Sequence, residues 1–261
     1  EIYFQNWGES TLVAELPLMI KHAASKGIYT HLSTNFSRNY KKGFLEDLID
    51  SGLALLHIDL DGLTQEVYEK YRKKGDLQLV LKNINLAVDI KKKTGVSFPQ
   101  IEVSMLAMKH NEHQFEDFKK MAIELEVDHY QIDKIQVDPN SNASKSWLPN
   151  NKEYIYDTYD REDRNTQCHW PWSGMVINWD GSVSPCCIVD SPKADFGNVY
   201  EKSIIEIWNN DYYRSSRAEF GDREQIVKQT ICNICKNKTH NCKNKLHKHN
   251  HAMHECHNKI N

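Results

Sequence analysis

The sequence predicts an α/β fold in which repeated strand–helix units build a parallel sheet, followed by a smaller cysteine-rich part. Up to about residue 135, short apolar runs alternate with longer amphipathic segments, as in βα units around a parallel sheet. All seven cysteines lie at residue 168 or beyond. Residues 138–165 are rich in Asn, Ser, Asp and Tyr and lose the periodicity. We therefore expect a βα domain at 1–137, a linker at 138–165, a cysteine-rich domain at 166–239 and a tail at 240–261.

Five strands and four helices are expected in the first domain. The helices follow helical apolar spacing: one over 12–25 that ends at Gly27, one that begins after the N-cap Thr64, one over 77–93 that ends before Gly95, and one over 114–125. Ligands usually bind at the loops that follow the strands in such folds. The predicted strands are residues 2–5, 29–34, 54–59, 100–107 and 129–135.

The second part carries a hairpin signal and a helix signal. Asn178-Trp179-Asp180-Gly181 places Asp-Gly between two short apolar runs, so residues 176–185 are expected to form a hairpin. A short helix is expected over 203–217. The tail alternates six histidines with Lys and Asn and offers little to bury, so we expect a loosely ordered, solvated terminus.

Composition excludes several classes of protein. No run of about 18 apolar residues could span a bilayer. Thirty-three basic and 36 acidic side chains give a net charge of −3, which predicts no nucleic-acid partner. No export signal is visible, so a cytoplasmic protein is expected. The chain opens without Met inside a strand-like segment, which suggests a truncated start.

The cysteines indicate a metal site. Cys168, Cys186 and the Cys232-x-x-Cys235 pair could bring four thiolates together around the hairpin. An odd number of cysteines, without an export signal, favours metal thiolates over disulfides. Spacing alone fits a structural zinc ion as well as an iron-sulfur cluster.

The second part closely resembles the SPASM/twitch extension of radical S-adenosylmethionine (SAM) enzymes. The resemblance rests on Cys168, on Gly181-Ser-Val-Ser-Pro-Cys186-Cys187, on Gly197-Asn-Val, on Ile204-x-x-Ile-Trp-Asn, on Arg217 and on Cys232-x-x-Cys235. It implies an auxiliary four-iron four-sulfur cluster on Cys168, Cys186, Cys232 and Cys235. Cys187, Cys242 and Cys256 are left either as ligands of a second site or as thiols without a metal, because the later cysteines depart from the two-cluster spacing.

The first part resembles the radical SAM partial parallel barrel from its second strand onward. Gly8-Glu9 stands where the family has Gly-Gly-Glu, which holds the SAM ammonium group, with Trp7 in place of one glycine. Thr34-Asn35 resembles the Thr-Asn-Gly turn, with Phe36 in place of glycine. Asp59 stands where the family commonly has a serine and could bind a ribose hydroxyl, and Arg72 would face the SAM carboxylate. The predicted SAM-binding residues are Gly8, Glu9, Asn35, Asp59 and Arg72.

No cysteine precedes Cys168, so the family's C-x3-C-x2-C loop, which ligates the catalytic cluster, is not in these 261 residues. We expect this chain alone to be inactive. In the complete enzyme, the resemblance implies that a reduced cluster, supplied by an electron-donor protein, cleaves SAM to methionine and a 5′-deoxyadenosyl radical. That radical would abstract hydrogen from a substrate, either a small polar metabolite or, as a close second, a peptide.

Two other classes of function stay open. A degenerate, non-enzymatic binding module with a structural zinc site would account for Trp7, Phe36 and Asp59, the three departures from the family pattern. A metal-storage or delivery protein would use the histidine-rich tail, although neighbouring lysines oppose the binding of a cation there.

Overall fold

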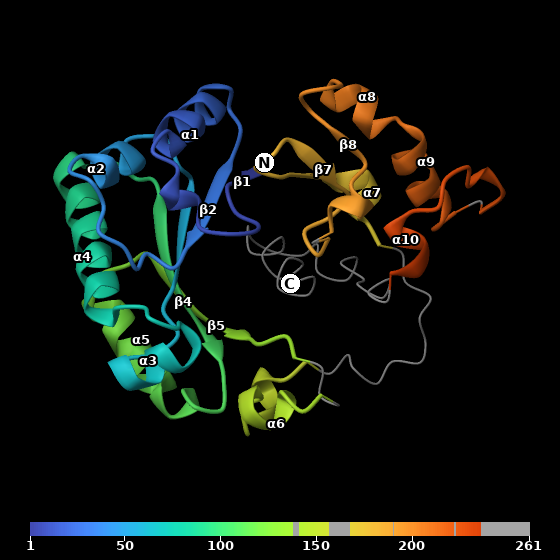
Figure 1. The fold of residues 1–261 in the computed structure, drawn as a ribbon. Coiled ribbons are helices and arrows are strands. Elements are labelled where there is room, and N and C mark those ends of the chain that lie inside the picture. The colour runs from blue at the N-terminus through green and yellow to red at the C-terminus, as the bar shows by residue number, and fades with distance from the viewer. Residues whose placement is uncertain (138–140, 157–167, 190, 222, 236–261) are drawn as a thin grey trace. The chain divides into compact units, whose positions relative to one another are not determined.

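The computed structural model describes residues 1–137, 141–156, 168–189, 191–221 and 223–235. The chain divides into two compact units, residues 1–159 and 160–261 (Figure 1). The histidine-rich tail, with Cys242 and Cys256, lies outside the described residues. None of the described helices combines the length and apolar character that a membrane span requires.

The first unit is built on a five-stranded sheet in which all neighbouring strands run parallel and the strand order follows the sequence. This confirms the predicted α/β fold class. Each strand overlaps its predicted segment with a shift of at most two residues at either end. The strands are β1 (Ile2–Tyr3), β2 (Thr30–Thr34), β3 (Leu55–Asp59), β4 (Gln100–Ala107) and β5 (His129–Lys134).

Helices connect these strands, and their caps follow the sequence. Thr64 caps α3 by accepting a hydrogen bond from the Val67 N–H at 3.3 Å, and Gly95 ends α4 in the left-handed conformation with φ +68°. α2 was not predicted, because its six residues are too few to establish a helical period. The helices are α1 (Leu16–Ser25), α2 (Phe44–Ile49), α3 (Gln65–Tyr71), α4 (Leu77–Thr94), α5 (Phe115–Glu124) and α6 (Ser144–Trp147).

The two faces of the sheet differ. Successive strand residues point to opposite faces, so each strand contributes alternate side chains to each of them. Leu32, Leu56, Ile58, Val103 and Met105 are fully buried on one face, in a core that also takes apolar residues from α1, α2, α4 and α5. Figure 1 shows α2 and α4 along this side of the sheet. The other face is polar and is described with the site.

The second unit is small and irregular. Its three-stranded sheet is antiparallel, and β6 and β7 form the predicted hairpin, with Gly181 at φ +78° in the turn. The single helix predicted over 203–217 is wrong, because the side chain of Asn210 accepts from the Tyr213 N–H at 3.1 Å and begins a second helix there. The elements are α7 (Trp170–Ser173), β6 (Val176–Ile177), β7 (Ser182–Ser184), β8 (Gly197–Asn198), α8 (Ile204–Trp208), α9 (Asp211–Ala218) and α10 (Ile231–Ile234).

Candidate functional site

Polar side chains occupy every second position of three neighbouring strands on the face opposite the helices. Parallel sheets usually carry apolar residues on both faces because helices cover both. A face of charged and amide side chains is therefore a departure that suits the binding of a polar ligand. The residues that alternate in this way are His57 and Asp59 in β3, Glu102 and Ser104 in β4, and Gln131 and Asp133 in β5.

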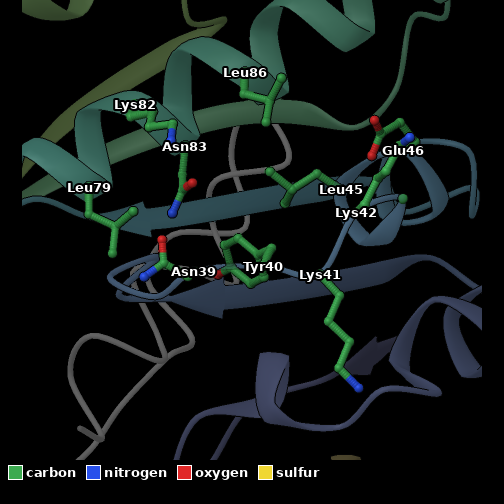
Figure 2. A pocket seen from close by; sticks show the side chains of 11 residues that line it. Asn39, Tyr40, Lys41, Lys42, Leu45, Glu46, Leu79, Lys82, Asn83 and Leu86 are labelled. Carbon is green, nitrogen blue, oxygen red and sulfur yellow. The ribbon is translucent and has the colours of Figure 1, made fainter.

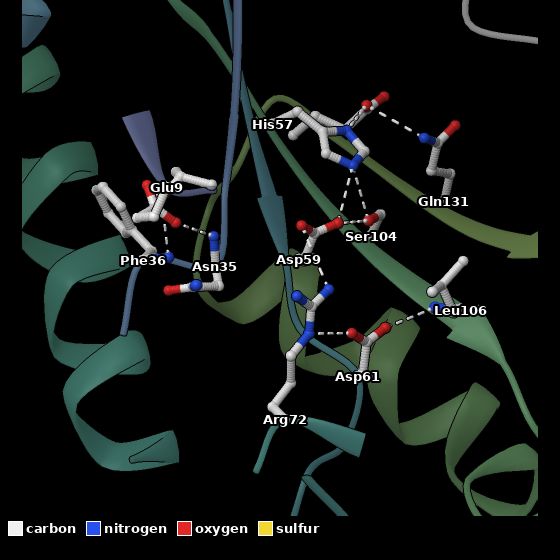
Figure 3. Close-up of polar contacts among 12 residues, drawn as sticks. Glu9, Asn35, Phe36, His57, Asp59, Asp61, Arg72, Ser104, Leu106 and Gln131 are labelled. Atoms are coloured by element: carbon white, nitrogen blue, oxygen red, sulfur yellow. Dashed lines mark hydrogen bonds and ion pairs between the residues drawn. The ribbon is translucent and has the colours of Figure 1, made fainter. Parts of the chain in front are cut away.

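His57 lies at the centre of this polar face (Figure 3). Its Nδ1 is 2.7 Å from the Glu102 carboxylate, and its Nε2 is 2.9 Å from the Ser104 hydroxyl and 3.4 Å from Asp59 Oδ1. Gln131 donates to the same Glu102 oxygen at 3.3 Å. His57 and Glu102 are almost fully buried, so this ion pair has little solvent to screen it.

Arg72, the C-cap residue of α3, links Asp59 to a second carboxylate. One Nη is 3.3 Å from Asp59 Oδ2, and Nε donates to Asp61 Oδ2 at 2.5 Å. Asp61 is fully buried and also accepts from the Leu106 N–H at 2.8 Å. The result is a chain of alternating charges in the order Glu102, His57, Asp59, Arg72 and Asp61.

This chain of charges fixes the protonation of its members. Burial would lower the pKa of His57, but hydrogen bonds and charges from Asp59 and Glu102 outweigh it and raise that pKa to about 10. Burial would raise the pKa of Asp59, but His57 and Arg72 hold it near 2. Near neutral pH His57 is therefore an imidazolium and Asp59 is a carboxylate.

Asp133 differs from its neighbours on the polar face. Burial raises its pKa to about 7, the carboxylates of Glu102, Asp59 and Asp61 add to the rise, and His57 opposes it. A carboxyl group that titrates near neutral pH can accept or release a proton under working conditions. Asp133 is thus the group of this face that is suited to proton transfer.

Two of the predicted SAM-binding residues, Glu9 and Asn35, meet beyond the carboxyl ends of β1 and β2. Glu9 Oε1 accepts hydrogen bonds from the Thr11 N–H, the Thr11 hydroxyl and the Thr34 hydroxyl, and Oε2 accepts from the Asn35 N–H at 3.2 Å. Glu9 is also the N-cap of the 3₁₀ turn η1 (Ser10–Leu12). The carboxylate is therefore held at the carboxyl end of β2 by groups from two segments.

The glycine positions near this carboxylate differ from each other. Gly8 has φ +91°, and an added Cβ would meet nothing within 4 Å, so its backbone conformation rather than crowding favours glycine. Phe36 also has a positive φ, at +53°, yet its ring is fully buried in the core. Phe36 thus keeps the backbone conformation that suits a glycine at this turn and adds apolar packing.

The other two predicted residues, Asp59 and Arg72, meet at the ion pair described above. Thr34 pairs with Ile58 in the sheet, so Asn35, which follows β2, and Asp59, the last residue of β3, lie at the same end of neighbouring strands. Gly8 and Glu9 follow β1, and Arg72 reaches Asp59 from the end of α3, so all five predicted residues lie at or after the carboxyl ends of strands, where ligands bind in parallel α/β folds. Their role in binding SAM stays a prediction.

The sequence analysis missed His57, Asp61, Glu102, Ser104 and Asp133. A signal was present, because each strand carries polar residues two positions apart within otherwise apolar sequence. That alternation indicates a strand with one polar face. It does not show which charged groups pair across strands, because pairing depends on the register between them.

A cavity of about 210 Å³ lies elsewhere on the first unit, between the segment that precedes α2 and helix α4 (Figure 2). Lys41, Lys42 and Lys82 line it together with one acid, Glu46. Asn83, also in its wall, donates to the carbonyl groups of Phe36 and Arg38 at 2.9 Å and so supports the turn after Asn35. No predicted site residue lines this cavity.

The predicted cluster ligands lie on three segments of the second unit. Cys168 precedes α7, Cys186 follows β7, Cys232 lies in α10 and Cys235 ends it. Cys168 lies close enough to Cys232 and Cys235 for their charges to interact, and Cys186 interacts likewise with Cys168 and Cys232. The fold thus brings the four thiols into one neighbourhood, and none of them forms a disulfide with another described cysteine.

The chemistry of this thiol set fits an iron-sulfur cluster. Burial raises the pKa of Cys168 to about 11 and that of Cys186 to about 12, so bare thiolates are unfavourable there and a cationic iron centre would stabilise them. In the part of the chain that the structure describes, no three His, Cys, Asp or Glu side chains gather as ligands of a single metal ion. Cys187, also buried, interacts with Cys168 and is a further thiol beside the set.

Family models match both units. Residues 3–122 match the radical SAM superfamily, and residues 168–243 match SPASM, an iron-sulfur cluster-binding domain. A probable GTP 3′,8-cyclase from Methanocaldococcus jannaschii is 27% identical over 174 residues, which are 58% of this chain and 56% of that protein. The PqqA peptide cyclase of Bradyrhizobium diazoefficiens is 24% identical over 246 residues, which are 80% of this chain and 60% of that protein.

Solved structures show the same fold. Streptococcus suis SuiB, solved bound to its precursor peptide SuiA, superimposes with a TM-score of 0.57 and 15% identity. The superposition covers 83% of this chain and 54% of SuiB. The 261 residues thus span little more than half of the length of SuiB and of the archaeal cyclase.

Proposed function

Because the chain belongs to the radical SAM superfamily and carries a SPASM iron-sulfur domain, we propose that it is the substrate-binding and auxiliary-cluster portion of an enzyme that cleaves SAM reductively. The observation that carries this proposal is the polar face of the sheet. It lies beside the strand ends where Glu9, Asn35, Asp59 and Arg72 gather. When bound, SAM and the catalytic cluster supply the radical that abstracts hydrogen from the substrate. The three thiolates for that cluster do not occur among these residues.

The chain's own residues would orient SAM and exclude water. The Glu9 carboxylate suits the SAM ammonium group, and Asp59 accepts hydrogen bonds from hydroxyl groups such as those of ribose. Arg72 is held between Asp59 and Asp61, so it can bind a carboxylate only with the donors that these two acids leave unused. Asp133 would accept or release a proton at the substrate.

We propose a peptide as the substrate, in a cytoplasmic setting that keeps the thiols reduced. The sequence analysis favoured a small polar metabolite with a peptide as a close second. PqqA peptide cyclase matches 80% of this chain, across both units, and SuiB was solved bound to a precursor peptide; these two relatives support the peptide. The alternative of a non-enzymatic zinc module has no support among these relatives.

The first test of the proposal is the iron, zinc and acid-labile sulfide content of this chain, purified without oxygen. We expect about four irons and four sulfides per chain, lost in Cys232→Ala and retained in Cys187→Ala, the matched control. One zinc ion without sulfide would contradict the proposal.

The second test uses the full-length enzyme with its upstream ligand loop, supplied with SAM and dithionite. We expect 5′-deoxyadenosine to form, and Glu9→Ala to reduce this formation at least tenfold. Addition of the substrate peptide should accelerate it. Acceleration by small polar metabolites, but by no peptide, would restore the alternative substrate class.

A further inference from the structure

Helix α9 places two polar side chains against the cysteine neighbourhood. Tyr213 and Arg217 are one helical turn apart, so their side chains emerge from the same face of the helix. Tyr213 is fully buried in an apolar cluster that includes Val183, Ile207 and Cys232. The Arg217 guanidinium lies over the Tyr213 ring, 5.4 Å from its centre.

Both side chains carry a buried donor without an acceptor. Among the described residues, the Tyr213 hydroxyl and Arg217 Nη2 have no hydrogen-bond partner, although Arg217 Nε donates to the Pro171 carbonyl at 2.8 Å. A buried donor left without an acceptor costs about 1–3 kcal/mol, and native proteins rarely leave two of them side by side. Two such donors on one helical turn therefore indicate an acceptor that the described residues do not supply.

The position of the donors identifies the kind of acceptor. Tyr213 packs in the same buried cluster as Cys232, one of the predicted cluster ligands. Pro171, which accepts from Arg217, is three residues after Cys168. Arg217 forms no ion pair with any described acid, and its guanidinium lies over the rings of Trp208 and Tyr213. An anionic, sulfur-rich group would satisfy both donors and balance the charge.

We infer that Tyr213 and Arg217 donate O–H···S and N–H···S hydrogen bonds to the auxiliary cluster and raise its reduction potential. The inference rests on the proposed function, because it requires the cluster to be present. Reduction adds one negative charge to the cluster, so donors and a cation beside it stabilise the reduced form more than the oxidised form. Tyr213 and Arg217 are thus tuning residues and not cluster ligands.

The test is a redox titration of the cluster-loaded chain, with dithionite as electron donor and electron paramagnetic resonance as readout. Tyr213→Phe keeps the ring and its packing, and Arg217→Gln removes the charge. Each should lower the ratio of reduced to oxidised cluster at a fixed potential about tenfold, a shift of the midpoint by about 59 mV to more negative values. Tyr212→Phe, which removes an exposed hydroxyl from the same helix, should leave the midpoint unchanged.

A second readout detects the hydrogen bond itself. In D2O, electron–nuclear double resonance of the reduced cluster should show a coupled exchangeable deuteron that is lost in Tyr213→Phe. Retention of the same coupling in that variant would assign it to a buried water and overturn the role of Tyr213. Cluster-loaded variants with unchanged midpoints would overturn the whole inference.

The outcomes separate the inference from the proposed function. If Tyr213→Phe loses the cluster altogether, the inference is tested by the midpoint potential of Arg217→Gln and by the deuteron coupling of the unmodified chain. An unchanged midpoint together with no deuteron coupling overturns the inference. If the unmodified chain holds no iron and sulfide, the proposed function fails first, and the inference falls with it. If it holds the cluster and the variants have no effect, only the inference fails.

Discussion

On the polar face of the sheet in the first unit, the charged side chains from Glu102 to Asp61 have partners within the chain. Beside the cysteines of the second unit, two buried donors have no partner among the described residues. The first arrangement is complete before any ligand arrives, so its geometry does not depend on SAM. The second is satisfied only when another group enters. Preorganisation of the first kind serves binding and catalysis, and the second couples the local structure to its cofactor.

The largest expected effect on stability comes from removing His57 from the chain of charges. Replacement of His57 by Ala should lower the free energy of unfolding by about 3–5 kcal/mol, because it leaves Glu102 buried without its cationic partner. Urea denaturation followed by circular dichroism measures this loss. His22→Ala, at an exposed position on α1, should change stability by less than about 0.5 kcal/mol. An equal loss in both variants would show that the charge chain does not stabilise the sheet.

The same residue predicts a dependence on pH. The pKa of His57 is raised from 6.5 to about 10 in the folded state, so its stabilisation is complete below pH 6.5 and is lost as pH rises towards 10. Within this window the free energy of unfolding should fall by up to about 1.4 kcal/mol per pH unit. Denaturation of the wild type and of His57→Ala across the window measures the difference. A wild-type slope no steeper than that of the variant would contradict the raised pKa.

A smaller effect is expected at Gly62, which lies against the backbone of α3. A Cβ added at Gly62 would lie 2.5 Å from the Tyr68 backbone nitrogen, so Gly62→Ala must displace α3, the helix that presents Arg72. We expect a loss of about 1–3 kcal/mol in unfolding free energy. Gly221→Ala, where the nearest atom would be 3.9 Å away, serves as the control. Similar melting temperatures for the two variants would show that α3 can shift without loss.

The smallest effect sharpens the contrast between the units. In the chain without its cluster, Tyr213→Phe removes a buried hydroxyl that has no partner, so stability should stay the same or rise by about 1 kcal/mol. Thermal unfolding of the apo chain measures this change. A clear loss of stability in the apo variant would mean that the hydroxyl already has an acceptor in the protein, and the two units would then not differ in the way described.

The sequence allowed the sheet to be predicted almost strand by strand, because its strands are apolar runs separated by helices with clear caps, such as Thr64 and Gly95. The places where Glu9, Asn35 and Asp59 lie also followed from the order of the strands. The chain of charges did not, because the pairing of His57 with Glu102 joins residues 45 positions apart and depends on the register of β3 and β4. The break between α8 and α9 was not predicted, because it depends on a side-chain contact, the hydrogen bond by which Asn210 caps α9.

The hydrogen bonds around Glu9 imply that this position requires two acceptor oxygens as well as a negative charge. Three donors converge on Oε1 and a fourth, the Asn35 N–H, reaches Oε2. Glutamine has the same shape but only one acceptor oxygen, so its amide nitrogen would face either the Asn35 N–H or the three donors of Thr11 and Thr34. A carboxylate is thus the side chain of this length that can accept from all four donors with its two oxygens in fixed directions.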